Sequence, residues 1–225
     1  MSRLFVKVCG ITSPADAAVA AEAGADAIGM VFWPGSPRAV SVEQARAIGA
    51  AVPASVVRVG VFVDASRDEM ARVADAAGLD LLQLHGEEPP EALATLPRPA
   101  LKAIRVGSGF VAADALRYGD ALGLLLDTRS AETPGGTGRP FDWSLVRGVR
   151  ERARFVVLAG GLTSDNVAAA LAAVRPHGVD ASSGLETAPG HKDPARVRAF
   201  VAAARAAERE TAALSGPARS GEDGE

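Results

Sequence analysis

The chain has 225 residues, of which 48% are hydrophobic, a length that fits one large α/β domain or two small ones. Its 24 basic and 27 acidic residues nearly balance, which argues against a nucleic-acid partner and against an acidic solvating domain. The N-terminus lacks the long apolar run of a signal peptide or membrane span, so we expect a cytoplasmic protein that binds no membrane. One cysteine cannot form an internal disulfide, and three histidines without paired spacing predict no metal site.

Short apolar runs rich in Val, Ile and Leu alternate with helical patterns and predict eight strands and eight helices. We expect strands at residues 4–8, 27–32, 56–61, 79–84, 101–104, 122–126, 155–158 and 179–181. The helices are expected at residues 14–23, 42–51, 67–77, 90–96, 111–118, 143–152, 164–174 and 194–207. Three of these helices are preceded by a residue type that caps helix starts, at Ser13, Ser41 and Ser66.

The alternation of strands and helices predicts an α/β fold. Continuous apolar strands are buried on both faces, as in a parallel sheet that helices cover. Eight such units favour a single closed (β/α)8 barrel of the TIM type over an open doubly wound sheet, and no G-x-G-x-x-G follows the first strand. We expect the barrel to span residues 1–209 and the polar, Gly-rich residues 210–225 to form a disordered tail. The Gly-rich loop at residues 133–140 is expected to be a mobile lid.

Two reactive side chains stand where such barrels carry their active sites, at the carboxyl ends of the strands. Cys9 follows the first strand and precedes Gly10, so a thiolate there is placed to act as a base on a substrate. A lone cysteine is more often a small buried hydrophobic residue, and only the position of Cys9 argues against that interpretation. Asp127 ends the apolar sixth strand, where it either takes part in the chemistry or caps a turn or pairs with Arg129.

Glycine-rich turns follow the seventh and eighth strands, at Gly160-Gly161 and at Ser182-Ser183-Gly184. Barrels often bind phosphate at these two turns through backbone N–H groups. Glycine lets a backbone approach a ligand closely, although glycines also end strands for reasons of turn geometry alone. Two such turns on neighbouring strands favour a phosphate site, and we expect the ligand to be a phosphosugar.

Three further residue types at the strand ends are candidates for the site. Arg38 follows a Pro-Gly-Ser-Pro loop, where its planar guanidinium either offers two donors to a carboxylate or is simply solvated. His85 follows the fourth strand, and because a single histidine more often makes structural hydrogen bonds, we place it beside the substrate rather than in proton transfer. Trp33 and Trp143 either pack on helices or edge the pocket, and both alternatives stay open.

Seven motifs occur in order at strand ends and turns of the predicted active face: Val6-Lys7-Val8-Cys9-Gly10-Ile11-Thr12, Ser36-Pro37-Arg38, Gln83-Leu84-His85-Gly86, Leu126-Asp127-Thr128, Gly135-Gly136-Thr137-Gly138 with Phe141-Asp142-Trp143, Ala159-Gly160-Gly161-Leu162, and Asp180-Ala181-Ser182-Ser183-Gly184-Leu185-Glu186. Together they resemble the phosphoribosylanthranilate isomerase family of tryptophan biosynthesis. The likeness runs from the first strand to about Phe200. Each motif is weak alone, but seven in order are highly specific.

The resemblance implies an Amadori rearrangement of N-(5-phosphoribosyl)anthranilate to 1-(2-carboxyphenylamino)-1-deoxyribulose 5-phosphate, without a metal or organic cofactor. By the same likeness, Asp127 is the general acid that opens the ribose ring to a Schiff base, and Cys9 is the general base that removes the C2 hydrogen. Arg38 is implied to hold the anthranilate carboxylate, and the two glycine-rich turns to hold the phosphate. Lys7 would favour the thiolate if its side chain points toward Cys9. Asp180 either meets a sugar hydroxyl or orients its neighbours.

Two departures from the family pattern concern the lid and the tail. Arg139-Pro140 stands after the Gly-rich loop, where family members often carry a lysine, and residues beyond about Ala207 have no counterpart. They put in doubt only the motion of the lid and any role of the tail.

Three other functions remain as alternatives. The barrel isomerase of histidine biosynthesis is similar at both phosphate turns but has an aspartate as its first-strand base, so Cys9 favours the anthranilate substrate, and acceptance of both substrates stays open. A metal-dependent pentose-phosphate epimerase needs converging His and Asp ligands, and only His85 lies at a plausible strand end. A binding-only barrel or an inactive partner subunit is disfavoured because Cys9 and Asp127 are both present. The chain is expected to be a monomer or a homodimer.

Overall fold

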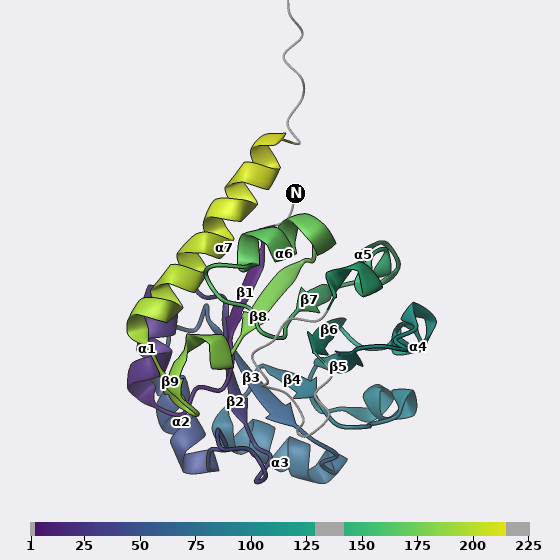
Figure 1. Cartoon of the computed structure of the whole chain (residues 1–225). Helices are drawn as coiled ribbons and strands as arrows, with labels where there is room; N and C mark the ends of the chain where they lie inside the picture. The colour runs from purple at the N-terminus through teal and green to yellow at the C-terminus, as the bar shows by residue number, and fades with distance from the viewer. Residues whose placement is uncertain (1–2, 129–141, 215–225) are drawn as a thin grey trace, which may run out of the picture.

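The computed structural model describes residues 3–128 and 142–214. Eight parallel strands close into a barrel in chain order, with the last strand paired to the first, which confirms the predicted (β/α)8 fold (Figure 1). The strands are β1 (Phe5–Val8), β2 (Ala27–Val31), β3 (Val57–Phe62), β4 (Leu81–Leu84), β5 (Ala100–Val106), β6 (Gly123–Thr128), β7 (Val156–Leu158) and β8 (Gly178–Ala181). All eight predicted strands are present.

The helices surround the barrel, as Figure 1 shows, and most match the predicted segments. They are α1 (Pro14–Glu22), α2 (Val42–Ala50), α3 (Arg67–Ala77), α4 (Ala112–Leu116), α5 (Val149–Arg152), α6 (Val167–Val174) and α7 (Pro194–Leu214), with 3₁₀ turns η1 (Pro90–Thr95), η2 (Trp143–Val146) and η3 (Ser183–Leu185). The three predicted caps are confirmed, because Ser13, Ser41 and Ser66 each accept a hydrogen bond from the backbone N–H three residues later.

Three predicted helices differ from the observed ones for local reasons. The segment at 90–96 forms only the 3₁₀ turn η1, and the helix expected at 143–152 is divided into η2 and α5 by Gly148, whose φ is +79°. Helix α6 begins three residues later than predicted, because the Asn166 side chain accepts a hydrogen bond from the Thr163 N–H and closes a turn there.

Helix α7 is longer than predicted and continues past residue 209, where the sequence placed the end of the barrel domain. It continues to Leu214, because residues 208–213 are Glu, Arg, Thr and Ala without a glycine or proline to end the helix. Arg205 fixes α7 to the base of the barrel, with Nη2 2.6 Å from the carboxylate of Asp26. The remaining residues assigned to the tail, 215–225, and the loop expected to be a lid lie outside the described residues.

Side chains alternate between two cores along each strand. Val6 and Val8 on β1 face outward into the large apolar core between strands and helices, whereas an inner core inside the barrel is formed by Ala27, Val59, Leu81, Leu101, Ala103, Leu125, Val157 and Ala159. Lys7 therefore faces the barrel interior, where it is fully buried. Its Cα partner on β8 is Asp180, so the two side chains share the interior face.

A small hairpin that the sequence patterns did not predict follows the barrel. Strands β9 (Glu186–Ala188) and β10 (His191–Lys192) pair antiparallel between η3 and α7. Gly190 in its turn has a φ of +83°. The hairpin brings Glu186 and Lys192 beside the end of β1. Among the described residues, no helix is both long and apolar enough to cross a membrane.

Candidate active site

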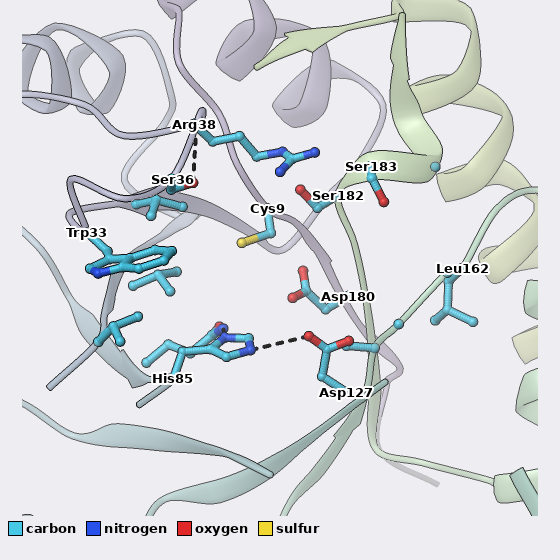
Figure 2. Close-up of a pocket in the computed structure, with 18 residues that line it drawn as sticks. Cys9, Trp33, Ser36, Arg38, His85, Asp127, Leu162, Asp180, Ser182 and Ser183 are labelled. Carbon is cyan, nitrogen blue, oxygen red and sulfur yellow. Dashed lines mark hydrogen bonds and ion pairs between the residues drawn. The ribbon is translucent and has the colours of Figure 1, made fainter. Parts of the chain in front are cut away.

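A pocket opens at the carboxyl ends of the strands and has about 750 Å³ of space including its mouth. Figure 2 shows the side chains that face it. The lining residues are Cys9, Val31, Trp33, Ser36, Arg38, Val61, Val63, Gln83, His85, Asp127, Ala159, Gly160, Gly161, Leu162, Asp180, Ser182, Ser183 and Gly184. All ten residues that the sequence assigned to catalysis or substrate binding are among them.

Cys9 lies directly after β1 with its backbone N–H donating to the Ala181 carbonyl at 2.9 Å. Lys7 precedes it by two residues and so lies on the same side of the strand. Gly29 on β2 makes room for both side chains, because a Cβ there would lie 2.7 Å from Sγ of Cys9 and 3.1 Å from Nζ of Lys7. The sequence left the direction of the Lys7 side chain open, and the structure shows that it points toward the thiol.

Burial and the charge of Lys7 have opposite effects on the pKa of the Cys9 thiol. Burial raises the pKa of the Cys9 thiol above its ordinary value, and the cation of Lys7 offsets only part of that increase. For Lys7, burial alone would lower the pKa, but Asp180 and Cys9 outweigh it and raise the pKa. At neutral pH the group beside the thiol is therefore an ammonium ion, which stabilises a thiolate whenever one forms.

Asp127 lies at the end of β6 and is 7% exposed. One carboxylate oxygen accepts a hydrogen bond from the Thr128 N–H at 2.8 Å, and the other lies 3.2 Å from Nε2 of His85 without the alignment of a hydrogen bond. Nδ1 of His85 in turn lies 3.0 Å from Nε2 of Gln83, which is buried. In Figure 2, Asp180 stands between Cys9 and Asp127, with its Oδ1 buried and without a hydrogen-bond partner.

The two glycine-rich turns pack against each other and against the strand that carries Asp127. Gly160 has a φ of +86°, and a Cβ there would lie 2.2 Å from Oγ1 of Thr128. At Gly184 a Cβ would lie 2.4 Å from the carbonyl oxygen of Leu162. Only glycine fits at these two positions, so each turn has one position without a side chain beside the pocket.

Arg38 lines the pocket, but two nitrogens of its guanidinium already donate hydrogen bonds to Glu186. Nε lies 2.9 Å from one carboxylate oxygen of Glu186 and Nη2 lies 2.7 Å from the other. Lys192 also contacts this carboxylate, with Nζ 2.6 Å from Oε1. Glu186 lay within a motif identified in the sequence, but without a role, and Lys192 was missed. The signal was not local, because 148 residues separate Arg38 from Glu186.

The two tryptophans have different positions. Trp33 lines the pocket and packs with Val31, Val61 and Cys9, and its indole lies over Gly35, where a Cβ would come within 2.5 Å of the ring. Trp143 packs instead on the outer core. The pocket therefore has one aromatic and aliphatic wall facing a polar side. Within residues 3–128 and 142–214, no cluster of His, Cys, Asp or Glu is arranged to hold a metal ion.

Comparisons with known proteins agree with this architecture. A family model described as N-(5'phosphoribosyl)anthranilate (PRA) isomerase matches residues 6–203. The N-(5'-phosphoribosyl)anthranilate isomerase of Pseudomonas fluorescens is 54% identical over 200 residues, which cover 88% of this chain and 94% of that protein. The crystal structure of phosphoribosyl anthranilate isomerase from Thermotoga maritima is 42% identical, with a TM-score of 0.85 over 91% of this chain and 100% of that chain.

A further similar solved structure is a complex with a ligand. It is phosphoribosyl anthranilate isomerase in complex with reduced 1-(o-carboxyphenylamino)-1-deoxyribulose 5-phosphate, 41% identical with a TM-score of 0.82 over 91% of this chain and all of that chain. The family model covers most of the chain, and the relatives exceed 30% identity along nearly their whole length. The chain therefore belongs to the N-(5'-phosphoribosyl)anthranilate isomerase family.

Proposed function

We propose that this chain isomerises N-(5-phosphoribosyl)anthranilate to 1-(2-carboxyphenylamino)-1-deoxyribulose 5-phosphate in tryptophan biosynthesis. The observation that carries the proposal is one pocket in which a thiol beside an ammonium ion and a buried carboxyl group face the same space, next to two backbone turns. An aldose-to-ketose rearrangement needs an acid and a base, that is, two groups with opposed protonation states, in one pocket.

In the first step Asp127 acts as the general acid. It protonates the ribose ring oxygen, the C1–O bond breaks, and the electron pair of the anilino nitrogen forms a C1=N Schiff base. The carboxylate left behind is stabilised by the Thr128 N–H and lies 3.2 Å from His85. These groups lie where negative charge develops, so they lower the energy of the transition state rather than of the bound substrate.

In the second step Cys9 acts as the general base. The thiolate removes a proton from C2. The electron pair of the C–H bond forms a C1=C2 bond, and the electrons of the C1=N bond return to the nitrogen as its lone pair. The Lys7 ammonium stabilises the thiolate form of the base. The resulting enolamine tautomerises to the C2 ketone, with the enol proton lost and a proton added at C1. Because the substrate's own iminium accepts the electrons, the step needs no cofactor.

Binding of the substrate uses the three other parts of the pocket. The phosphate is assigned to the turns at Gly160-Gly161 and Ser182-Ser183-Gly184, and the anthranilate ring to the wall that includes Trp33. Arg38 is assigned to the anthranilate carboxylate. The unpartnered Oδ1 of Asp180 is assigned to a sugar hydroxyl, which would satisfy it.

Cys9 must stay reduced to act as a base, which fits a reducing compartment, and we therefore place the enzyme in the cytoplasm. We further propose that it acts as a monomer or a homodimer without a nucleic-acid partner. One of the similar Thermotoga maritima structures is described as monomers generated from a dimeric phosphoribosylanthranilate isomerase. We also propose that the catalytic barrel domain spans residues 1–209, with helix α7 continuing beyond that boundary to Leu214.

The proposed reaction is tested by adding purified protein to freshly generated phosphoribosylanthranilate and following the loss of its fluorescence in the presence of a chelator. Turnover under these conditions supports the reaction and its independence of metal. No turnover by folded protein would contradict the proposal, and the aminoimidazole carboxamide substrate of the histidine-pathway isomerase would then be tried in an assay of its own product.

A further inference from the structure

Glu186 is the first residue of β9, and its carboxylate accepts hydrogen bonds from one edge of the Arg38 guanidinium. A guanidinium has five N–H donors, and the edge formed by Nε and Nη2 donates to both oxygens of this carboxylate, at 2.9 and 2.7 Å. Nη1 and Nη2 together keep three hydrogens, two of which lie parallel on the edge between these nitrogens. That end edge is a second planar fork, matched in geometry to another carboxylate.

The aliphatic part of Arg38 is fixed as firmly as its head. It crosses Gly10, whose φ is +72°, and a Cβ there would lie 2.6 Å from Cδ of Arg38 and 2.8 Å from Oγ of Ser182. The side chain is therefore confined between the end of β1 and the end of β8. The Arg38 side chain is only 15% exposed, so it has little room to rotate. The contact of Glu186 with one edge of the guanidinium therefore determines the direction of the end edge.

The charge of this cluster favours an incoming anion. Lys192 is fully buried in its side chain and donates to the same carboxylate, with Nζ 2.6 Å from Oε1 and 3.3 Å from the Ser182 carbonyl. Two cations thus surround one carboxylate, and the cluster has one net positive charge. Burial alone would raise the pKa of Glu186, but the Arg38 hydrogen bond and the Lys192 charge outweigh it and lower that pKa. Glu186 therefore stays ionised at neutral pH.

The β9–β10 hairpin holds Glu186 in place from several sides. Arg196 at the start of α7 donates from Nη1 to the Glu186 carbonyl at 2.6 Å, and the Thr12 hydroxyl donates to the Gly190 carbonyl in the hairpin turn. The Asp193 N–H donates to the Leu185 carbonyl at 2.9 Å. The hairpin is thus tied to the end of β1 and to α7, and the position of the carboxylate is fixed.

We infer that Glu186 is a positioning residue that holds the Nη1–Nη2 edge of Arg38 toward the substrate and thereby determines specificity for an arylamine that carries a ring carboxylate. The inference rests on the proposed function. Glu186 acts through Arg38 and does not itself touch the substrate. The class of compound that fits is a phosphoribosylated arylamine with an ortho carboxylate, and the same compound without the carboxylate gains nothing from this edge.

The experiment compares two substrates that differ only in the ring carboxylate: phosphoribosylanthranilate and phosphoribosylaniline, both prepared from the amine and ribose 5-phosphate. Wild type, Glu186→Gln, Arg38→Met and the control Asp80→Asn are assayed on each, with thermal unfolding measured for all four. Asp80 is the matched control because its carboxylate holds Arg58 through the same pair of nitrogens, at 2.9 Å each, away from the pocket.

We expect Glu186→Gln to lower kcat/KM for phosphoribosylanthranilate by about 10–100-fold, mainly through KM, and to change kcat/KM for phosphoribosylaniline by less than about threefold. Arg38→Met loses the same preference, and Asp80→Asn retains it. Turnover of the aniline substrate also shows that Glu186→Gln is folded. If that variant does not fold, Glu186→Asp replaces it, because its shorter side chain cannot keep both contacts.

Two results overturn the inference. Either Glu186→Gln lowers activity on both substrates equally, which marks a merely structural role, or it keeps the wild-type preference while Arg38→Met loses it. Failure of the proposed function is distinct, because the wild type itself would then not turn over phosphoribosylanthranilate.

Discussion

Lys7 and Asp180 form a buried ion pair beside Cys9, with Nζ 2.9 Å from Oδ2, on neighbouring strands whose Cα atoms are in register. The pair places a cation within reach of the thiol and leaves Oδ1 of Asp180 free for a ligand. Burying an ion pair costs desolvation free energy that the attraction between the two charges does not always repay. A buried pair beside a cysteine at the end of a barrel strand therefore indicates a functional site.

Replacing Lys7 by Met removes the cation that lowers the pKa of the Cys9 thiol, so this pKa moves further up. The acidic limb of the kcat/KM profile, which reports the free base, is expected to move to higher pH. Activity at neutral pH falls by about 10-fold or more, a part of the roughly 10²–10⁴-fold that a positioned base contributes. The measurement is kcat/KM from pH 5 to 10.

Lys102→Met is the matched control for Lys7→Met. Lys102 is also buried and ion-paired, with Nζ 2.8 Å from Glu88, but it lies outside the pocket. It is expected to leave the acidic limb in place. An unshifted limb in Lys7→Met, or an equal shift in both variants, would contradict the role given to Lys7.

Gly29→Ala is expected to displace the thiol, because the added Cβ would lie 2.7 Å from Sγ of Cys9. We predict a loss in kcat of about 10-fold or more with little change in KM, since a base moved by about 1 Å loses its alignment. Gly119→Ala is the control, because the added Cβ there has no atom within 4 Å. Wild-type kcat in folded Gly29→Ala would show that the thiol position is unimportant.

Gly184→Ala is expected to separate the two glycine-rich turns to which we assign the phosphate, because its Cβ would lie 2.4 Å from the Leu162 carbonyl. The predicted result is a KM raised by about 10-fold or more and inhibition by inorganic phosphate weakened in parallel, with a smaller effect on kcat. Steady-state kinetics with phosphate as competitor measures both. Unchanged phosphate inhibition would place the anion elsewhere.

Glu88 anchors the segment after β4 and gives a prediction on stability. Its carboxylate accepts from the N–H groups of Asp64 and Gly86 and from Lys102. Burial alone would raise the pKa of Glu88, but the Lys102 hydrogen bond and charge outweigh it and lower the pKa from its usual value of 4.5. A carboxyl with a lowered folded pKa stabilises the fold above the unfolded pKa, and this is lost as pH falls through the folded pKa.

The expected result for Glu88→Gln is a decrease of about 3–5 kcal/mol in the free energy of unfolding at pH 7, because Lys102 is left buried without its partner. Its loss of stability below about pH 4.5 is correspondingly shallower than that of the wild type. Urea unfolding at several pH values measures both. Glu87→Gln is the control, since that side chain is 82% exposed and its pair with Arg105 contributes at most about 1 kcal/mol. Equal effects of the two substitutions would contradict this account.

The fold was predictable because its signals are local. Apolar runs locate the eight strands, and serines locate three helix starts, so the strand ends that carry Cys9 and Asp127 could be named from the sequence. Element lengths were less predictable, since the left-handed Gly148 divides one expected helix and the composition after Glu208 extends another.

The electrostatic part of the site was not predictable, because it depends on contacts between distant segments. The direction of Lys7 was fixed only when β1 paired with β8 and the interior face was known. The pairing of Arg38 with Glu186 joins a loop residue to the first residue of β9, 148 positions apart, and no period or spacing encodes it. Residue types at strand ends therefore indicate which groups are present, and the closed barrel determines their partners.

The two proton transfers that we assign to Cys9 and Asp127 are tested by measuring kcat for phosphoribosylanthranilate in wild type, Cys9→Ala and Asp127→Asn. Affinity for reduced 1-(o-carboxyphenylamino)-1-deoxyribulose 5-phosphate is measured in parallel. Each variant is expected to lose about 10²-fold or more in kcat while keeping wild-type affinity for this analogue. Wild-type kcat in either folded variant would contradict this assignment.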